Sequence, residues 1–153
     1  MFQKLIATRN DLTLTVLRLV LGVVFFAHGA QQVLGLFGGS GYAGTMQFFT
    51  QVVGIPAPFA FLALMAQFLG GIGLLVGFLT RIAVFGIAID MLVAIFTVHI
   101  RVGFFMNWAG HQNGEGYEYH LLALALCFIL LVKGSGAISL DRALYKERWA
   151  EHG

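Results

Sequence analysis

The segment Leu12–Leu34, LTLTVLRLVLGVVFFAHGAQQVL, decides the fold of this chain. It is almost wholly apolar, and as a helix it would reach roughly 34 Å, which exceeds the thickness of about 30 Å of a membrane core. Two similar stretches follow at 59–79 and 82–100, and each is long enough to span as well. A fourth stretch, at 117–133, is shorter, so we expect its start to lie about 9 Å inside the membrane boundary.

The composition favours a membrane protein and excludes several other classes. Of the 153 residues, 59% are hydrophobic and 10% are charged, whereas soluble domains carry about a quarter charged residues. Nine Lys and Arg against seven Asp and Glu give a net charge of +2, too sparse for a nucleic-acid-binding surface. The single cysteine, Cys127, excludes an internal disulfide and a CxxC motif. We therefore expect one all-α domain over 1–153, a four-helix bundle in contact with the lipid bilayer.

Basic residues next to the apolar stretches set the expected orientation. Arg101 alone flanks one side of the predicted spans, whereas the other side carries Lys4, Arg9, Arg81, Lys133, Arg142, Lys146 and Arg148. Because short loops rich in Lys and Arg stay in the cytoplasm, we predict that both termini are cytoplasmic. A cleaved signal peptide is the alternative for the first stretch, although that run is long and contains Arg18.

Two amphipathic segments outside the spans are predicted to be helical. Apolar and polar residues alternate from Met46 to Val53, after the flexible Gly38-Gly39-Ser40-Gly41. This pattern predicts a short helix that lies in the outer interface or folds back toward the bundle. Ser139 can cap a C-terminal amphipathic helix that runs through Trp149. That helix would rest on anionic lipid or be solvated.

Small and ionisable residues inside the spans indicate how the helices pack. Gly73 and Gly77 have the spacing that lets helices approach closely, either within a compact monomer or across a homodimer interface. Arg18 and Asp90 lie at similar depths from the cytoplasmic side, so an ion pair between them would neutralise both charges. Alternatively, Asp90 would relay protons or ions.

A second polar layer is expected toward the outer side. His28, Gln67 and Glu118 fall about 9 to 12 Å below the outer ends of their helices, and His120 lies about 3 Å deeper. His28, Glu118 and His120 could bind a metal or haem, exchange protons with a quinone headgroup, or serve structure alone. Because Glu118 and His120 point about 200° apart on an ideal helix, both reach one cavity only if that helix begins irregularly. Arg101 could pair with Glu115 or Glu118 at the outer rim, or it could bind a ligand.

Two blocks of motifs carry a resemblance to a known family. The first block is Arg18-Leu19 with Gly22, then Phe25-Phe26-Ala27-His28-Gly29 and Phe37-Gly38-Gly39. The second is Gly114-Glu115-Gly116-Tyr117-Glu118-Tyr119-His120-Leu121-Leu122, followed by Ser139-Leu140-Asp141. Over most of its length the chain resembles the DoxX family. This resemblance implies a four-helix bundle in the bacterial cytoplasmic (inner) membrane. It further implies a link to quinol oxidases, to thiosulfate:quinone oxidoreductases or to oxidative stress.

The first functional hypothesis is a small membrane component of a redox system, such as a subunit of a quinone-linked oxidoreductase. It would bind a quinone or quinol in an outer-leaflet pocket. The expected catalytic residues are His28, Glu118 and His120. The same three residues are the candidate ligands of a metal or haem, and we favour a quinone over either of these cofactors. The expected ligand-binding residues are Gln32, Gln67 and Arg101. Many DoxX relatives carry Lys where this chain has Gln32, so a neutral amide replaces that charge.

Two further hypotheses come from other classes of protein. The chain could be a non-enzymatic anchor or assembly partner that recruits oxidoreductases through its basic C-terminal helix. Alternatively, it could be a small-molecule or proton transporter in which Asp90 is the relay. The anchor hypothesis depends on Arg142, Lys146, Arg148 and Trp149.

Overall fold

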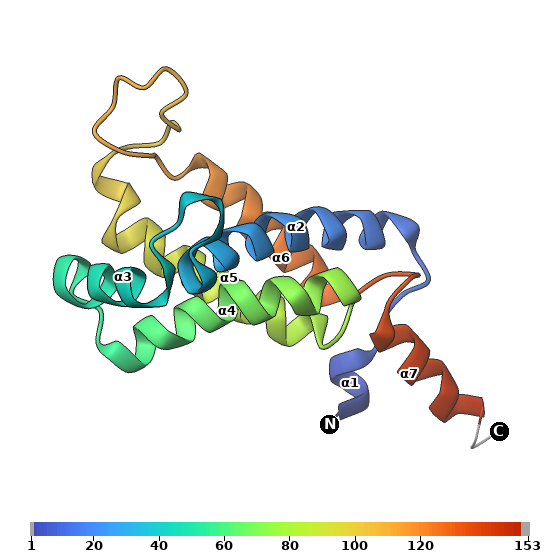
Figure 1. Ribbon diagram of the computed structural model, residues 1–153. Coiled ribbons are helices and arrows are strands. Elements are labelled where there is room, and N and C mark those ends of the chain that lie inside the picture. The colour runs from blue at the N-terminus through green and yellow to red at the C-terminus, as the bar shows by residue number, and fades with distance from the viewer. Residues whose placement is uncertain (1, 151–153) are drawn as a thin grey trace.

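The computed structural model describes residues 2–150, with the side chains of 146–150 not described. Every regular element in this part of the chain is a helix, which confirms the all-α class. The bundle consists of α2 (Leu12–Leu34), α4 (Ala57–Val76), α5 (Thr80–Thr97) and α6 (Glu118–Lys133) (Figure 1). Three of these helices, α2, α4 and α5, are long and apolar enough to cross a membrane. The fourth, α6, has 16 residues and reaches about 24 Å, so it is the shortest helix of the bundle, as predicted.

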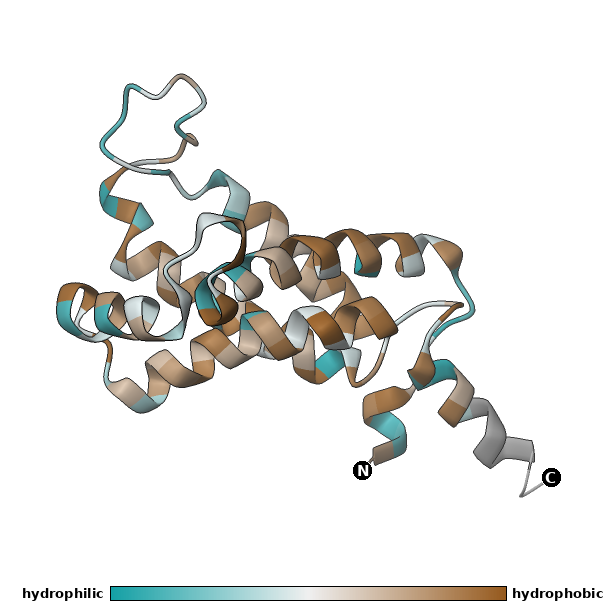
Figure 2. Cartoon of the chain, in the orientation of Figure 1, coloured by the Kyte–Doolittle hydropathy of each residue, from teal (hydrophilic) through white to brown (hydrophobic). Residues whose placement is uncertain are grey.

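Large apolar side chains cover the outside of the bundle. Figure 2 shows apolar residues along all four bundle helices. Many of them are exposed, and representative examples on the four helices are Val23, Leu62, Phe96 and Phe128. Such a surface is far larger than the apolar patches that soluble monomers expose. These side chains therefore face the lipid bilayer.

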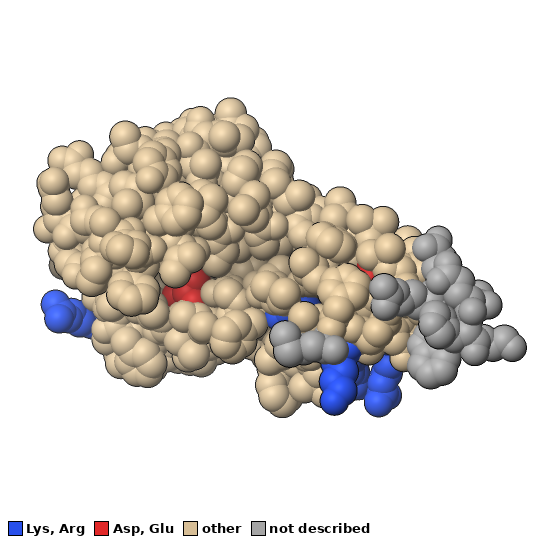
Figure 3. All heavy atoms as spheres, turned by 90° about the horizontal axis from the view of Figure 1, so that it is seen from below, with Lys and Arg blue, Asp and Glu red and all other residues tan. Residues whose placement is uncertain are grey.

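Both ends of the chain lie at one end of the bundle, which we call the terminal end (Figure 1). Here α1 (Phe2–Ile6), which the sequence analysis missed, and α7 (Leu140–Ala150), which it predicted, lie outside the bundle. Basic side chains gather at the same end (Figure 3). Arg101, on the short segment η3 (His99–Arg101), lies at the opposite end. The bundle thus has the charge asymmetry that the sequence predicts.

Two connections at the opposite end complete the fold. The first contains η1 (Leu36–Gly38), α3 (Gly41–Gln47) and the π-helical segment η2 (Phe48–Val53). The predicted short helix is therefore present, although it begins earlier and widens into a π-helix. The second connection, 102–117, has no regular helix and projects beyond α5 and α6 (Figure 1).

Close contact between α2 and α4 depends on glycines. A Cβ atom built on Gly29 would lie 2.4 Å from the Cα of Phe68, and one built on Gly71 would lie 2.5 Å from the backbone nitrogen of Phe26. No side chain fits at such distances, so the two backbones touch. Gly77 likewise packs within the chain, because its Cβ would lie 2.5 Å from the Cβ of Ser139. This glycine of the proposed dimer motif is therefore used for packing inside the monomer.

The predicted ion pair between Arg18 and Asp90 is not formed. Arg18 is buried, and its guanidinium donates hydrogen bonds to four backbone carbonyls: those of Leu74, Leu75 (3.0 Å), Ser135 (3.0 Å) and Ile138 (2.7 Å). Two of these carbonyls belong to the last turn of α4, where carbonyls have no partner within the helix. Helical side chains point toward the helix N-terminus, so Arg18 reaches toward the terminal end. Asp90 lies about 15 Å from the start of α5 and is too deep to meet it.

Asp141 stabilises the start of α5 from a distant part of the chain. Its carboxylate accepts hydrogen bonds from the backbone N–H groups of Leu79 (2.7 Å) and Thr80 (3.0 Å). Burial raises the pKa of Asp141, while these hydrogen bonds and the positive charge of Arg18 oppose that rise. The contact places the α4–α5 break at residues 77–79, slightly before the predicted break at 79–82.

Candidate ligand-binding cavity

The bundle contains a partly open cavity of about 450 Å³ at the end opposite the termini. It lies between α2, α4, α5, α6 and the π-helical segment η2, and the second connection contributes to its wall. Most of the lining is apolar. The polar residues of the lining are His28, Gln32, Gln67, Asp90, Thr97, His99, Glu115, Tyr119 and His120.

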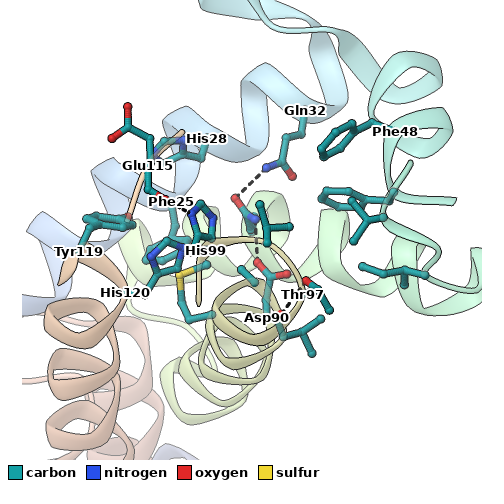
Figure 4. A pocket seen from close by; sticks show the side chains of 18 of the residues that line it. Phe25, His28, Gln32, Phe48, Asp90, Thr97, His99, Glu115, Tyr119 and His120 are labelled. Carbon is teal, nitrogen blue, oxygen red and sulfur yellow. Dashed lines mark hydrogen bonds between the residues drawn. The ribbon is translucent and has the colours of Figure 1, made fainter. Parts of the chain in front are cut away.

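One side of the cavity is a cluster of rings. The centroids of the His99 and His120 rings lie 4.2 Å apart, and those of Tyr119 and His120 lie 5.4 Å apart. His28 approaches the same cluster, with its ring centroid 6.3 Å from that of Tyr119 (Figure 4). The Nδ1 atom of His99 is 2.8 Å from the backbone carbonyl oxygen of Glu115, so the second connection is fastened to η3 beside the cavity.

A chain of hydrogen bonds crosses the cavity wall from α2 to α5. The side-chain amide of Gln32 donates to the carbonyl oxygen of Gln67 at 3.2 Å. The amide of Gln67 then donates to the Asp90 carboxylate at 2.7 Å (Figure 4). This chain positions three polar side chains from three helices along one side of the cavity.

Three residues that line the cavity each have a buried polar atom without a hydrogen-bond partner. These atoms are Oε1 of Gln32, the hydroxyl of Tyr119 and Nδ1 of His120. Buried polar atoms in native proteins are nearly always hydrogen-bonded, and an unpaired one costs about 1–3 kcal/mol. All three residues line the same cavity, so a ligand with matching polar atoms would satisfy them once the side chains that cover these atoms shift.

Four of the six predicted catalytic and ligand-binding residues meet at this cavity, and two do not. His28, Gln32, Gln67 and His120 line it. Glu118 instead accepts hydrogen bonds from the backbone N–H of Met106 and the indole N–H of Trp108, at 3.0 and 2.9 Å, and holds the second connection. Glu118 is the first residue of α6 and points away from the His120 face, as the angle between them on a helix requires.

Arg101 does not line the cavity, and its side chain is exposed. The expected pair with Glu115 or Glu118 is not formed. The carboxylate of Glu115 accepts a hydrogen bond from the backbone N–H of Asn107 at 2.7 Å instead. Both glutamates therefore help to fold the second connection.

The predicted metal ligands do not come together. Across residues 2–145, whose side chains are described, no group of three or more His, Cys, Asp and Glu side chains is placed to hold a metal ion. His28 and His120 share the cavity, but Glu118 lies outside it. The arrangement is suited to hydrogen bonding rather than to a metal or haem site made of these three residues.

Sequence reasoning missed two cavity residues that carry chemistry. In the sequence analysis Asp90 is assigned to an ion pair with Arg18 or to a proton relay and His99 has no role, yet both line the cavity. The spacing of Asp90, Ala94 and Thr97 at i, i+4 and i+7 places them on one face of a helix. This pattern could have predicted that Asp90 shares a surface with the small side chain of Ala94 and the polar side chain of Thr97. No comparable pattern marks His99, which lies on the short segment η3 after α5 has ended.

The fold and the cavity define a class: a small helical membrane protein with a cavity at one end of its bundle. Residues 13–100 match the family model of DoxX. The chain belongs to the DoxX family, as its motifs indicated, and it is a multi-pass protein of the bacterial inner membrane.

Two relatives cover most of the chain. It is 30% identical over 138 residues to "Inner membrane protein YqjF" of Escherichia coli (strain K12), covering 90% of this chain and 96% of that protein. It is 29% identical over 130 residues to "Putative oxidoreductase CatD" of Bacillus subtilis (strain 168), covering 85% of each chain. No solved structure matches the chain.

Proposed function

We propose that this protein binds a quinone, a quinol or a similar small redox molecule in its cavity, as a membrane component of a redox system. The observation that carries the proposal is the group of unpartnered polar atoms of Gln32, Tyr119 and His120, three residues that line the cavity. The size agrees, because the cavity of about 450 Å³ falls within the range of about 300–1,000 Å³ of small-molecule sites. The name of the CatD relative, an oxidoreductase, supports the redox assignment.

The positions of the unpartnered atoms suit a ring with oxygens on opposite edges. Tyr119 and His120 lie on one side of the cavity and Gln32 lies on the other (Figure 4). A quinone carries a carbonyl oxygen at each edge of its ring, and a quinol carries a hydroxyl at each edge. Tyrosine and histidine N–H or O–H groups can donate to a carbonyl, whereas the Gln32 oxygen can accept from a hydroxyl. Phe25 and Met91 supply apolar contacts for the ring.

The imidazoles beside the cavity supply proton chemistry. Interconversion of quinone and quinol moves electrons and protons in equal number, and an imidazole can give or take a proton near neutral pH. We assign the proton transfer to His120, with His28 next to it, and the electron transfer to an oxidoreductase partner. Glu118, which does not reach the cavity, has no place in this scheme.

We further propose that the terminal end faces the cytoplasm. The support is the gathering of basic side chains at that end (Figure 3) together with the general excess of Lys and Arg in cytoplasmic loops. The cavity then lies in the outer half of the membrane. A reporter that is active only in the cytoplasm is fused either to the C-terminus or to the connection 102–117. We expect activity from the C-terminal fusion, and activity of the fusion at 102–117 would contradict this orientation.

A direct binding measurement tests the proposed function. The protein in mild detergent is titrated with a short-chain quinone, and bound quinone is separated from quinone dissolved in empty micelles. We expect saturable binding that weakens about five- to tenfold in Tyr119→Phe, which removes one hydroxyl and keeps the ring. Tyr42→Phe is the matched control, because Tyr42 is exposed on α3 and does not line the cavity. Non-saturable binding, or equal affinity in the Tyr119→Phe variant, contradicts the proposal.

A second candidate function is favoured by one observation. The C-terminal helix α7 lies outside the bundle and projects from its terminal end (Figure 1), although Asp141 in its first turn joins it to the start of α5. It could hold a soluble oxidoreductase at the membrane. Of the residues expected to make that contact, the side chains of Lys146, Arg148 and Trp149 lie outside the described residues. Alanine substitutions at Arg142 and Lys146 that abolish co-purification of an oxidoreductase would support this anchor function, and unchanged co-purification would oppose it.

A further inference from the structure

Asp90 carries a buried charge for which the structure provides no counter-charge. Its exposed fraction is 9%, it lines the cavity, and it accepts a hydrogen bond from the neutral amide of Gln67. None of the residues that line the cavity is Lys or Arg. The arginine expected to neutralise it, Arg18, makes its hydrogen bonds to carbonyls at the terminal end. An ionisable residue inside a membrane span is costly and normally pairs with an opposite charge.

The surroundings of Asp90 are suited to one kind of counter-charge. Aromatic rings of Phe25, Phe48, Phe49 and Tyr119 line the same cavity, and the face of an aromatic ring attracts a cation. Glu115 also borders the cavity, but its carboxylate points away from it and accepts a hydrogen bond from the backbone N–H of Asn107 (Figure 4). The other titratable groups that line the cavity are His28, His99, Tyr119 and His120. No Lys or Arg side chain of the lining balances the Asp90 carboxylate, so the cavity disfavours an anion.

We propose that the cavity also binds lipophilic organic cations, with the Asp90 carboxylate as the counter-ion and the aromatic rings as the walls. This site goes beyond the quinone site and does not depend on it, because its main determinant is the charge of Asp90. Anions of the same shape are rejected. A small lipophilic cation can reach the site from the bilayer, whose apolar core surrounds the bundle.

Two probes of nearly the same shape and opposite charge make a sharp test. Tetraphenylphosphonium and tetraphenylborate are offered to the purified protein in nonionic detergent by equilibrium dialysis, with empty micelles as the blank. We expect the wild-type protein to bind the phosphonium at least about tenfold more tightly than the borate. Equal binding of the two ions, or tighter binding of the borate, overturns the proposal.

Variants at Asp90 assign the preference to its charge. Asp90→Asn keeps an oxygen that can accept from Gln67, so the fold should persist, and phosphonium binding should fall about tenfold or more. Asp90→Glu keeps the charge and should retain the preference for the cation. Asp11→Asn is the matched control, since it makes the same chemical change at the N-cap of α2, where Asn caps equally well. Wild-type phosphonium affinity in Asp90→Asn overturns the proposal.

The same preparations separate this inference from the proposed function. Because Asp90 also lines the proposed quinone site, the fold of Asp90→Asn is checked by its circular-dichroism spectrum and its unfolding temperature rather than by quinone binding. If the wild type binds the quinone and not the phosphonium, the cation site is wrong and the proposed function stands. If it binds the phosphonium and not the quinone, the proposed function is wrong and the cation site stands.

Discussion

The two ends of the bundle differ in what their buried charged and polar side chains contact. At the terminal end, the charged groups complete the helix ends: Arg18 binds the last carbonyls of α4, Arg81 binds those of α6, and Asp141 binds the first N–H groups of α5. At the cavity end, Tyr119 and His120 have polar atoms without partners and line the cavity, whereas Gln3 and Thr80, which have unpartnered atoms at the terminal end, do not line it. The same kind of residue therefore serves stability at one end, and at the other end it is available for a ligand.

This difference predicts which substitutions change stability and which change binding. Substitutions at the terminal end should lower the free energy of unfolding, because they leave helix-end groups unpaired in a buried place. Substitutions of the unpartnered groups at the cavity end should leave it nearly unchanged. The predictions below are arranged from the largest expected change to the smallest.

Arg18→Met should cause the largest loss of stability. The substitution removes a buried guanidinium and leaves four carbonyls without their donor, so we expect a loss of about 3 kcal/mol or more. Reversible unfolding in mixed detergent micelles, followed by circular dichroism, measures it. Arg9→Met, at an exposed position near the same end, is the control and should change stability little. A loss in Arg18→Met no larger than in the control would show that this end does not depend on its buried charge.

Asp141→Ala should cost less, because it removes two hydrogen bonds at one helix start. We expect a loss of about 1–2 kcal/mol, the usual effect of removing a helix cap. Hydrogen exchange gives a local measurement: the amides of Leu79 and Thr80, which now donate to Asp141, should exchange faster. Amides at the far end of α5, near Ile95, should be unaffected. Unchanged protection of Leu79 and Thr80 would contradict the capping role.

His120→Phe should separate binding from stability. The exposed fraction of His120 is 6% and its Nδ1 atom has no partner, so replacement by an apolar ring of similar shape should change the free energy of unfolding by less than about 1 kcal/mol. Quinone affinity should nevertheless fall about tenfold. Unfolding and quinone titration of the same preparation provide both values. A large loss of stability would mean that His120 has a structural role like that of Arg18.

Glu118→Gln should give the smallest change in global stability. Its carboxylate holds Met106 and Trp108 in the second connection rather than in the bundle, so we expect a loss below about 1 kcal/mol. The connection 102–117 should loosen locally, and limited proteolysis should cut it faster. Because Glu118 lies outside the cavity, quinone affinity should stay near that of the wild type. A loss of quinone affinity as large as in His120→Phe would show that Glu118 contributes to the binding site.

Depth along the helices was enough to predict part of the cavity from the sequence. Apolar length defines the spans, and counting residues from their ends places His28, Gln67 and His120 at similar levels. These three residues do share the cavity. Depth is predictable because it follows from the rise of a helix, a local property that needs no knowledge of how the helices are arranged.

Direction and long-range contact could not be predicted in the same way. Glu118 lies at the depth of the cavity along its helix but points away from it. The Arg18 side chain is long enough to make its hydrogen bonds at a different depth from its own backbone. Asp141 lies 61 residues beyond Thr80 and accepts a hydrogen bond from its backbone N–H group. The sequence around α5 contains no sign of that contact. Counting residues from the helix ends also could not predict that Asp90 lacks a counter-charge, because this depends on the direction of the Arg18 side chain.

Ligand-induced stabilisation of the wild type and of His120→Phe tests the central claim most directly. A ligand that binds the folded state at about 100 times its dissociation constant stabilises it by about 2.7 kcal/mol. We predict that a saturating short-chain quinone raises the unfolding temperature of the wild-type protein, and that the rise is largely lost in His120→Phe although that variant is equally stable without quinone. The absence of a rise in the wild type, or an equal rise in both proteins, would contradict the claim that the cavity end keeps its polar groups for a ligand.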